Sequence, residues 1–233
     1  SIGGFDTAIG NRLCVALSDL APPAADKSLI EFTGRAPNNQ VYYGEFDSPA
    51  DFLRAFRRAK AKEETRDGKF FNLANLPLVY FYRPPGMALA DPGQSPATYG
   101  AQFVGTGKDQ GTKLVVDVVP VTLEYRVVVA AWNLPVLERL VANLMISLAD
   151  YTNNRHRLTA AVTERGASFD LDGHLINGRS LEFSNLSSPR GEGRLFAAEA
   201  SLSVAAELLR VREEQHIEMR YVLERPWVMN CGR

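Results

Sequence analysis

Residues 121–148, VTLEYRVVVAAWNLPVLERLVANLMISL, decide the fold of this chain. The first eleven alternate between apolar and polar side chains and then become continuously apolar and β-branched, which predicts a strand. Asn133 and Pro135 supply a helix start, with an N-cap residue followed by proline in the first turn. The expected buried face of this helix is Leu137, Leu140, Val141, Leu144 and Leu148. The strand pattern resumes in RLTAAV at 157–162, so the segment predicts a strand–helix–strand scaffold without a catalytic group.

The composition is that of a globular protein. At 233 residues the chain is long enough for one large domain or two small ones. Its 45% hydrophobic and 23% charged residues suit a folded core, and a net charge of -1 gives no overall attraction to nucleic acid or anionic membranes. No apolar run approaches the ~20 residues that span a bilayer, and residues 1–10 lack a secretory signal pattern. We therefore expect a soluble protein made in a cytoplasm, with Cys14 and Cys231 as free thiols in preference to a disulfide.

Residues 1–75 predict a region of helices and short strands. Apolar residues at helical spacing predict a helix over 6–20, with Asp6 or Thr7 as its cap. Residues 29–33 and 40–46 predict short strands joined by a turn.

A second helix in this region has a clear start and a basic face. Asp47 or Ser48 is the expected cap, and Pro49 lies in the first turn. The basic residues of this helix are Arg54, Arg57, Arg58, Lys60 and Lys62. They fit either a contact with an acidic partner or nucleic acid, or a solvated face that keeps the protein soluble; the pattern favours the solvated face.

Residues 76–233 predict a second region that contains the central strand–helix–strand unit. A strand over 76–82 carries Pro77 near its start, which predicts a sheet edge or a strand entry. Residues 84–112 are rich in Gly, Pro, Ala, Gln and Ser without a strong period. This segment is either an arm that orders against a neighbouring subunit or an insertion without regular structure.

The later part of this region predicts several strands. Asp172-Gly173 and Asn177-Gly178 are typical of tight hairpin turns. Residues 196–204 alternate as a long strand, with a helix over 197–212 as the competing interpretation, and 217–223 predict a final strand. The predicted fold class is thus α+β: a mixed or antiparallel sheet, a central amphipathic helix packed on it, N-terminal helices and the long Gly/Pro-rich arm.

The sequence offers no catalytic, cofactor or metal motif. His156, His174 and His216 lie far apart without an HExxH spacing, and the two cysteines form no CxxC. No GxSxG elbow is present, and the glycines at 105 and 107 lack the spacing of a phosphate-binding loop. Asp170 and Asp172 fit turn formation as well as cation binding. We expect no enzyme activity, no cofactor and no metal.

The order of these elements resembles the tail-terminator or neck proteins of tailed bacteriophages. The resemblance covers roughly residues 76–211. It is carried by NLPLVYFYRP (75–84) before the Gly/Pro-rich arm, the strand and helix of 118–148, NNRHRLTAAV (153–162), DGHLINGRSLEF (172–183) and LFAAEASLSV (195–204). The N-terminal region has no counterpart in the resemblance, and its basic helix suggests added neck or baseplate contacts.

The resemblance implies a virion structural protein of a contractile tail, assembled in the host cytoplasm. It implies six-fold rings that cap or join the tail tube or sheath at the neck, with DNA passing through the lumen. The implied partners are further copies of the chain and tube, sheath or neck proteins, with no membrane. The expected contact residues are Arg83, Tyr99 and Phe103 in the arm, Arg179 and Arg190 near the hairpin loops, and Arg54, Arg57 and Arg58 on the basic helix.

Three alternatives stay open on the sequence. The first is a baseplate or tube-initiator component of a contractile tail. The second, from another class, is a small-molecule-binding or enzymatic α+β domain with its site in the 84–112 loop. The third is an accessory nucleic-acid-binding protein, which predicts salt-sensitive DNA binding by the isolated chain.

Overall fold

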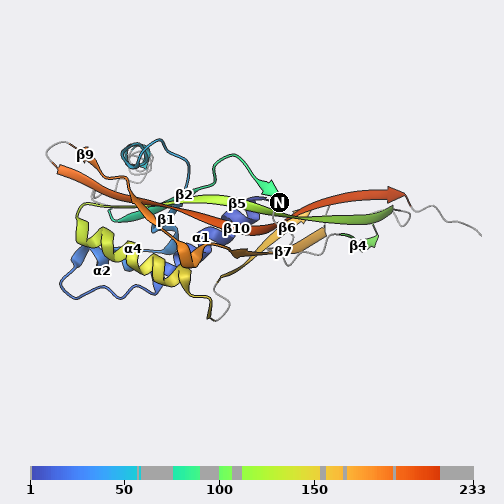
Figure 1. Ribbon diagram of the computed structural model, residues 1–233, viewed down its shortest axis with the longest axis horizontal. Helices are drawn as coiled ribbons and strands as arrows, with labels where there is room; N and C mark the ends of the chain where they lie inside the picture. Colours follow the sequence, from blue (N-terminus) through green and yellow to red (C-terminus); the bar gives the residue numbers. More distant parts are fainter. Residues whose placement is uncertain are drawn as a thin grey trace, which may run out of the picture.

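The computed structural model describes residues 2–56, 58, 76–89, 100–106, 112–152, 156–164, 167–190 and 193–215. Two long antiparallel strands, β5 (Thr112–Ala131) and β10 (Gly193–Gln215), run along the length of the molecule and form the centre of its sheet (Figure 1). The sheet order is β1-β2-β5-β10-β7-β6, and β3, β4, β8 and β9 pair beside β5 or β10.

The remaining elements complete an α+β fold. The helices are α1 (Ile2–Ser18), α2 (Lys27–Thr33), α4 (Leu134–Ala149) and a helix over residues 49–56 and 58, which we call the basic helix. The shorter strands are β1 (Val41–Tyr43), β2 (Leu78–Tyr82), β3 (Ala88–Leu89), β4 (Gly100–Thr106), β6 (Arg157–Glu164), β7 (Ala167–Leu175), β8 (Phe183–Asn185) and β9 (Ser188–Arg190). Since β1 runs parallel to β2 while the other pairs are antiparallel, the sheet is mixed. This confirms the predicted α+β class with a mixed sheet, a central helix and N-terminal helices.

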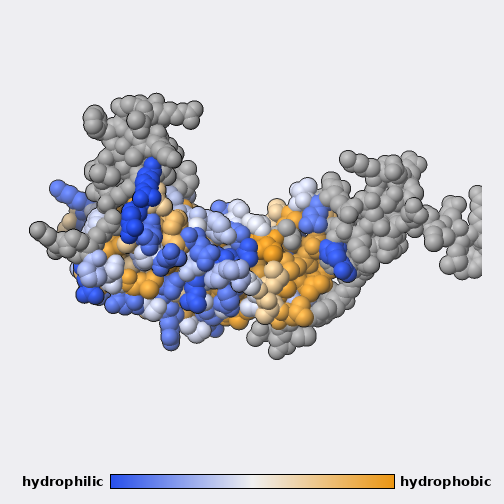
Figure 2. Space-filling view, turned by 90° about the horizontal axis from the view of Figure 1, so that it is seen from above, coloured by the Kyte–Doolittle hydropathy of each residue, from blue (hydrophilic) through white to orange (hydrophobic). Residues whose placement is uncertain are grey.

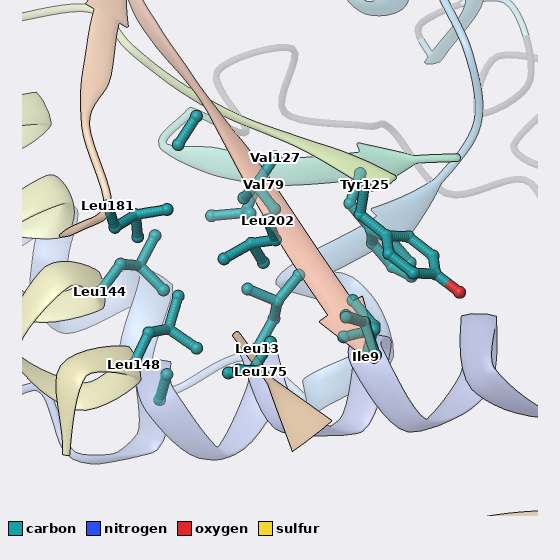
Figure 3. Packing of buried hydrophobic residues seen from close by; sticks show 14 of the residues in the cluster. Ile9, Leu13, Val79, Tyr125, Val127, Leu144, Leu148, Leu175, Leu181 and Leu202 are labelled. Carbon is teal, nitrogen blue, oxygen red and sulfur yellow. The ribbon is translucent and has the colours of Figure 1, made fainter. Parts of the chain in front are cut away.

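Helices cover the two faces of the sheet unequally. α1, α2 and α4 lie on one face, which we call the helical face, and the basic helix lies on the other, the second face (Figure 1). The core of the helical face joins α1 and α4 to odd-numbered residues of β5 and to the even-numbered residues of β10 from Ala198 to Ala206. Figure 3 shows Leu13, Leu144 and Leu202 meeting there. Residues from both regions expected from the sequence therefore share one core.

α4 follows its sequence prediction closely. The Asn133 side chain caps it by accepting the Val136 amide at 2.9 Å, and Pro135 occupies the first turn. Of the five residues expected on its inner face, four are buried and Val141 is partly buried. The cap and the 3.6-residue period together fix this helix.

The N-terminal region departs from the prediction at two points. α1 begins at Ile2, so Asp6 lies inside the helix, where its carboxylate binds side chains from the sheet instead of capping the helix. Residues 29–33, predicted as a strand, belong to α2, because Asp26 accepts the Leu29 amide at 3.2 Å and starts a helix. The strand predicted over 40–46 is present as the shorter β1.

The start of the basic helix is confirmed. The Ser48 hydroxyl accepts the Asp51 amide at 3.2 Å and donates to the Asp51 carboxylate at 2.6 Å, which resolves the choice of cap in favour of Ser48. Pro77 lies directly before the first residue of β2, and β2 lies between β1 and β5. Of the two positions predicted for this proline, the strand entry is therefore correct and the sheet edge is wrong.

The two glycine dipeptides do not form the predicted hairpins. β7 continues straight through Asp172-Gly173, where a Cβ on the glycine would lie 2.6 Å from the buried Phe5 ring and 3.0 Å from the Ala205 carbonyl oxygen. The chain therefore needs a glycine at 173 so that β7 can pack closely against Phe5 and Ala205. At the second dipeptide, Asn177 has φ −103° instead of the positive φ of a tight hairpin turn, and the chain continues into a 3-10 turn at Gly178–Ser180. A Cβ on Gly178 would clash with the Leu148 carbonyl group.

The 84–112 segment contains two strands that the sequence did not predict. β3 and β4 both pair with β5, β4 through a register shift between Phe103 and Gly105. Residues 90–99 and 107–111 lie outside the described residues. β10 confirms the strand over 196–204 and excludes the competing helix, whereas the strand predicted over 217–223 lies outside the described residues.

Candidate functional site

Three features of the described residues bear on function: a polar cluster with a groove beside α1, a hollow on the second face, and strand edges along the β5–β10 ribbon. The first is the cluster around Asp6. Its carboxylate accepts hydrogen bonds from Arg83 Nε at 3.0 Å, the Tyr125 hydroxyl at 2.9 Å and the Tyr43 hydroxyl at 3.3 Å. The Asp6 and Arg83 side chains are only 16% and 19% exposed. Through Arg83 and Tyr125 this mostly buried cluster joins α1 to the end of β2 and to the interior of β5.

The electrostatics of this cluster fit a structural role. Burial by itself lowers the pKa of Arg83, but the hydrogen bond and charge of Asp6 outweigh it and raise that pKa above its ordinary value. Burial and the neighbouring Asp6 raise the pKa of Tyr125. Both groups therefore stay protonated near neutral pH and act as fixed donors.

A groove of about 620 Å³ lies beside this cluster, between α1 and the strands β1 and β2. Gly3 and Gly10 leave it open on the helix side, Phe81 and Val41 line it on the sheet side, and Cys14 lies in its wall. Burial raises the pKa of the Cys14 thiol, which donates to the Pro37 carbonyl at 3.7 Å. A thiol with a raised pKa is a poor nucleophile near neutral pH.

The second feature is a hollow of about 360 Å³ on the second face of the sheet, which we call the acidic hollow. Its lining residues include Arg126 from β5, Glu199 and Ser201 from β10, and Glu182 from the segment after β7. Glu199 lies 3.8 Å from Arg126 and accepts the Tyr82 hydroxyl at 3.2 Å. Figure 2, which views the second face, shows hydrophilic residues across its middle.

A further carboxylate borders the acidic hollow. Glu124 lies two residues before Arg126 on β5 and accepts the hydroxyls of Ser201 at 3.0 Å and Ser203 at 2.7 Å. The Asn177 amide fixes the wall of the hollow by donating to the Ser201 carbonyl and accepting the Ser203 amide, both at 2.8 Å. The sequence singled out Asn177 only as a turn residue. For Glu124, Ser201 and Ser203 the only local signal was the alternation of polar residues along β5 and β10.

The third feature is the pair of free backbone edges on the ribbon. β10 pairs with β7 only through Val204–Ala206, so from Glu207 to Gln215 its only partner among the described strands is β5. The ladder with β7 ends where the Glu207 carboxylate accepts the Asp172 amide at 3.1 Å. On the other side of this part of β5 lies β4, whose outer edge has no partner among the strands that the structure describes.

The residues predicted for contact lie on separate elements. Arg83 is held by Asp6, and the Arg179 guanidinium lies over the Tyr151 ring, 4.6 Å from its centroid. Arg54 and Arg58 are exposed on the basic helix, and Arg54 pairs with Asp51 at 3.1 Å.

All eight of these contacts stay predictions, and four of them fall on side chains that the structure does not describe. Phe103 belongs to β4 and Arg190 to β9, but their side chains are not described. Tyr99 and Arg57 lie outside the described residues.

Neither His156 nor His174 belongs to a described metal site, and His216 lies outside the described residues. His156 stacks on Tyr151 at 4.8 Å, and burial together with His156 and Arg157 lowers the pKa of His174. Within the described ranges, no group of three or more His, Cys, Asp or Glu residues is placed to hold a metal ion.

No known family model and no curated protein matches this sequence. Among the helices in the described part of the chain, none is both long and apolar enough to cross a membrane.

Proposed function

We propose that this chain is a virion structural protein of a contractile phage tail. In this proposal, copies assemble into a ring that caps or joins the tail tube or sheath at the neck. The partners are further copies of the chain, arranged in a six-fold ring, and the adjoining tube, sheath or neck proteins.

The observation that carries this proposal is the projecting ribbon of β4, β5 and β10. β5 and β10 extend past the helices at one end of the molecule (Figure 1). With a rise of about 3.3 Å per residue, the singly paired part of β10 presents an edge about 30 Å long. Unpaired edges are templates for strands of another chain, and natural proteins cover or use them.

The two free edges of the ribbon also suit a closed ring. One belongs to β4 and the other to β10, so a contact between them joins two different surfaces of neighbouring copies. Such a head-to-tail contact repeats around a rotation axis and closes when the angle between neighbours permits. A self-complementary contact would instead stop at a dimer.

The mass of the purified protein tests this proposal. We expect light scattering to give a mass several times that of the 25.7 kDa chain, either alone or after mixing with tail tube protein from the same source. A chain that stays monomeric at every concentration, alone and with tube, sheath and neck proteins, would exclude the proposed function.

A further inference from the structure

We propose that the acidic hollow of one copy binds the basic helix of a second copy. This inference rests on the proposed function, because it names one contact through which copies assemble. It concerns side chains on the second face of the sheet and is separate from the ribbon edges described above.

The charge around the hollow favours a cationic partner. The lining and border of the hollow carry three carboxylates and one guanidinium: Glu124, Glu182, Glu199 and Arg126. Another nearby arginine, Arg179, has its guanidinium over the Tyr151 ring. Glu182 and Glu124 are exposed, so an incoming cation reaches them without displacing buried groups.

The hollow is also rigid enough to recognise a partner. Hydrogen bonds from two serines hold the Glu124 carboxylate, and the Tyr82 hydroxyl holds Glu199. Asn177 ties the neighbouring segment to β10 through two bonds of 2.8 Å. Because the acceptors are already oriented, little side-chain entropy is lost when a guanidinium binds.

The basic helix is a firmly placed donor. Ser48 caps its first turn, and Phe52 stacks on Tyr80 of β2 with ring centroids 4.5 Å apart and an interplanar angle of 18°. Its exposed side carries Arg54 and, one turn later, Arg58. Arginine presents several donors in a planar fork that matches carboxylates.

A second copy is the occupant that these charges select. The hollow and the helix belong to one chain, so each copy carries both halves of the contact. In the structure Arg54 pairs with Asp51 of its own helix, and the hollow is lined by residues from β5, β10 and 177–184. A nucleic acid would be attracted to the helix but repelled by the three carboxylates, whereas a second copy satisfies both surfaces.

A charge exchange tests this contact in the full chain. Glu182→Lys and Arg58→Glu both replace exposed residues, so each variant is expected to fold, which circular dichroism checks. Each single reversal should weaken assembly at least about tenfold in dissociation constant, since it places like charges opposite each other. The double variant restores the attraction with the signs exchanged and should return to within about threefold of the natural chain. Glu138→Lys, an exposed reversal on α4 across the sheet, is the matched control and should leave assembly unchanged.

Several results would overturn the inference. If the natural chain assembles and the single reversals assemble equally well, the contact is wrong while the proposed function stands. The contact is also wrong, and the proposed function again stands, if the double variant assembles more weakly than both single variants, because that result means the two reversals act independently. If Arg58→Glu abolishes DNA retention without changing assembly, the helix binds nucleic acid instead. A natural chain that never assembles would reject the proposed function itself.

Discussion

Removing the Asp6 carboxylate should destabilise the protein strongly, although this residue lies on an N-terminal helix. Asp6→Ala deletes the ion pair with Arg83 at 3.0 Å and the bonds from Tyr125 at 2.9 Å and Tyr43 at 3.3 Å. The Arg83 side chain is only 19% exposed, so the variant leaves a mostly buried guanidinium without its carboxylate. Breaking a buried pair costs about 3–5 kcal/mol, and the partial exposure places the expected loss near the lower end, about 3 kcal/mol.

A double-mutant cycle in urea separates this interaction from general damage to α1. Arg83→Leu removes the guanidinium that Asp6→Ala leaves buried without its carboxylate. The loss of unfolding free energy in the double variant should therefore be smaller than the sum of the two single losses by about 1–2 kcal/mol. Glu138→Ala, at an exposed position of α4, is the control and should change the free energy of unfolding by less than about 0.5 kcal/mol. Additive single effects, or a loss below about 1 kcal/mol for Asp6→Ala, would refute the assignment of the cluster as a structural tie.

Three further predictions concern the core and the response to pH. Leu144→Ala, at a fully buried position of α4, should lower the free energy of unfolding by about 2–5 kcal/mol in a denaturant titration, and a loss under about 0.5 kcal/mol would contradict its place in the core. Gly173→Ala should lower the free energy of unfolding by about 1–3 kcal/mol because the new methyl group meets the Phe5 ring. Phe5→Leu in the same chain should recover part of that loss. If Gly173→Ala were as stable as the natural chain, the site would have room for a methyl group. Folding lowers the pKa of His174 below its ordinary 6.5, so the unfolded chain binds more protons than the folded chain in this pH range. The contribution of His174 to stability is therefore present above pH 6.5 and is lost as the pH falls through the folded pKa. His174→Gln should flatten this part of the stability–pH curve, and an unchanged slope would contradict the assignment to His174.

Local sequence signals predicted α4 and the start of the basic helix, because a cap, a proline and a periodic apolar face all lie within a few residues of each other. They failed at α2, where Leu29, Ile30 and Phe32 favour a strand by composition while Asp26 starts a helix. Asp172-Gly173 has the local form of a turn, yet the glycine is required by Phe5, which is far away in the sequence. Tertiary contacts of this kind leave no local pattern.

The candidate site was accessible to sequence reasoning only in part. The basic helix was visible because its charges lie close together in the chain. The acidic hollow was not, because the pairing of Ser201 with Arg126 and of Ser203 with Glu124 across β5 and β10 brings its residues together. Strand register at a separation of about 80 residues is set by the whole sheet and its turns, so the segments alone do not reveal which charges will meet.

Electron microscopy of the purified chain tests most directly whether its surfaces serve to hold copies together. We predict closed rings of uniform diameter, and we predict that Arg58→Glu and Glu182→Lys each disperse them while the combined variant restores them. Fields of isolated single particles at every protein concentration, with or without tail tube protein, would contradict the account.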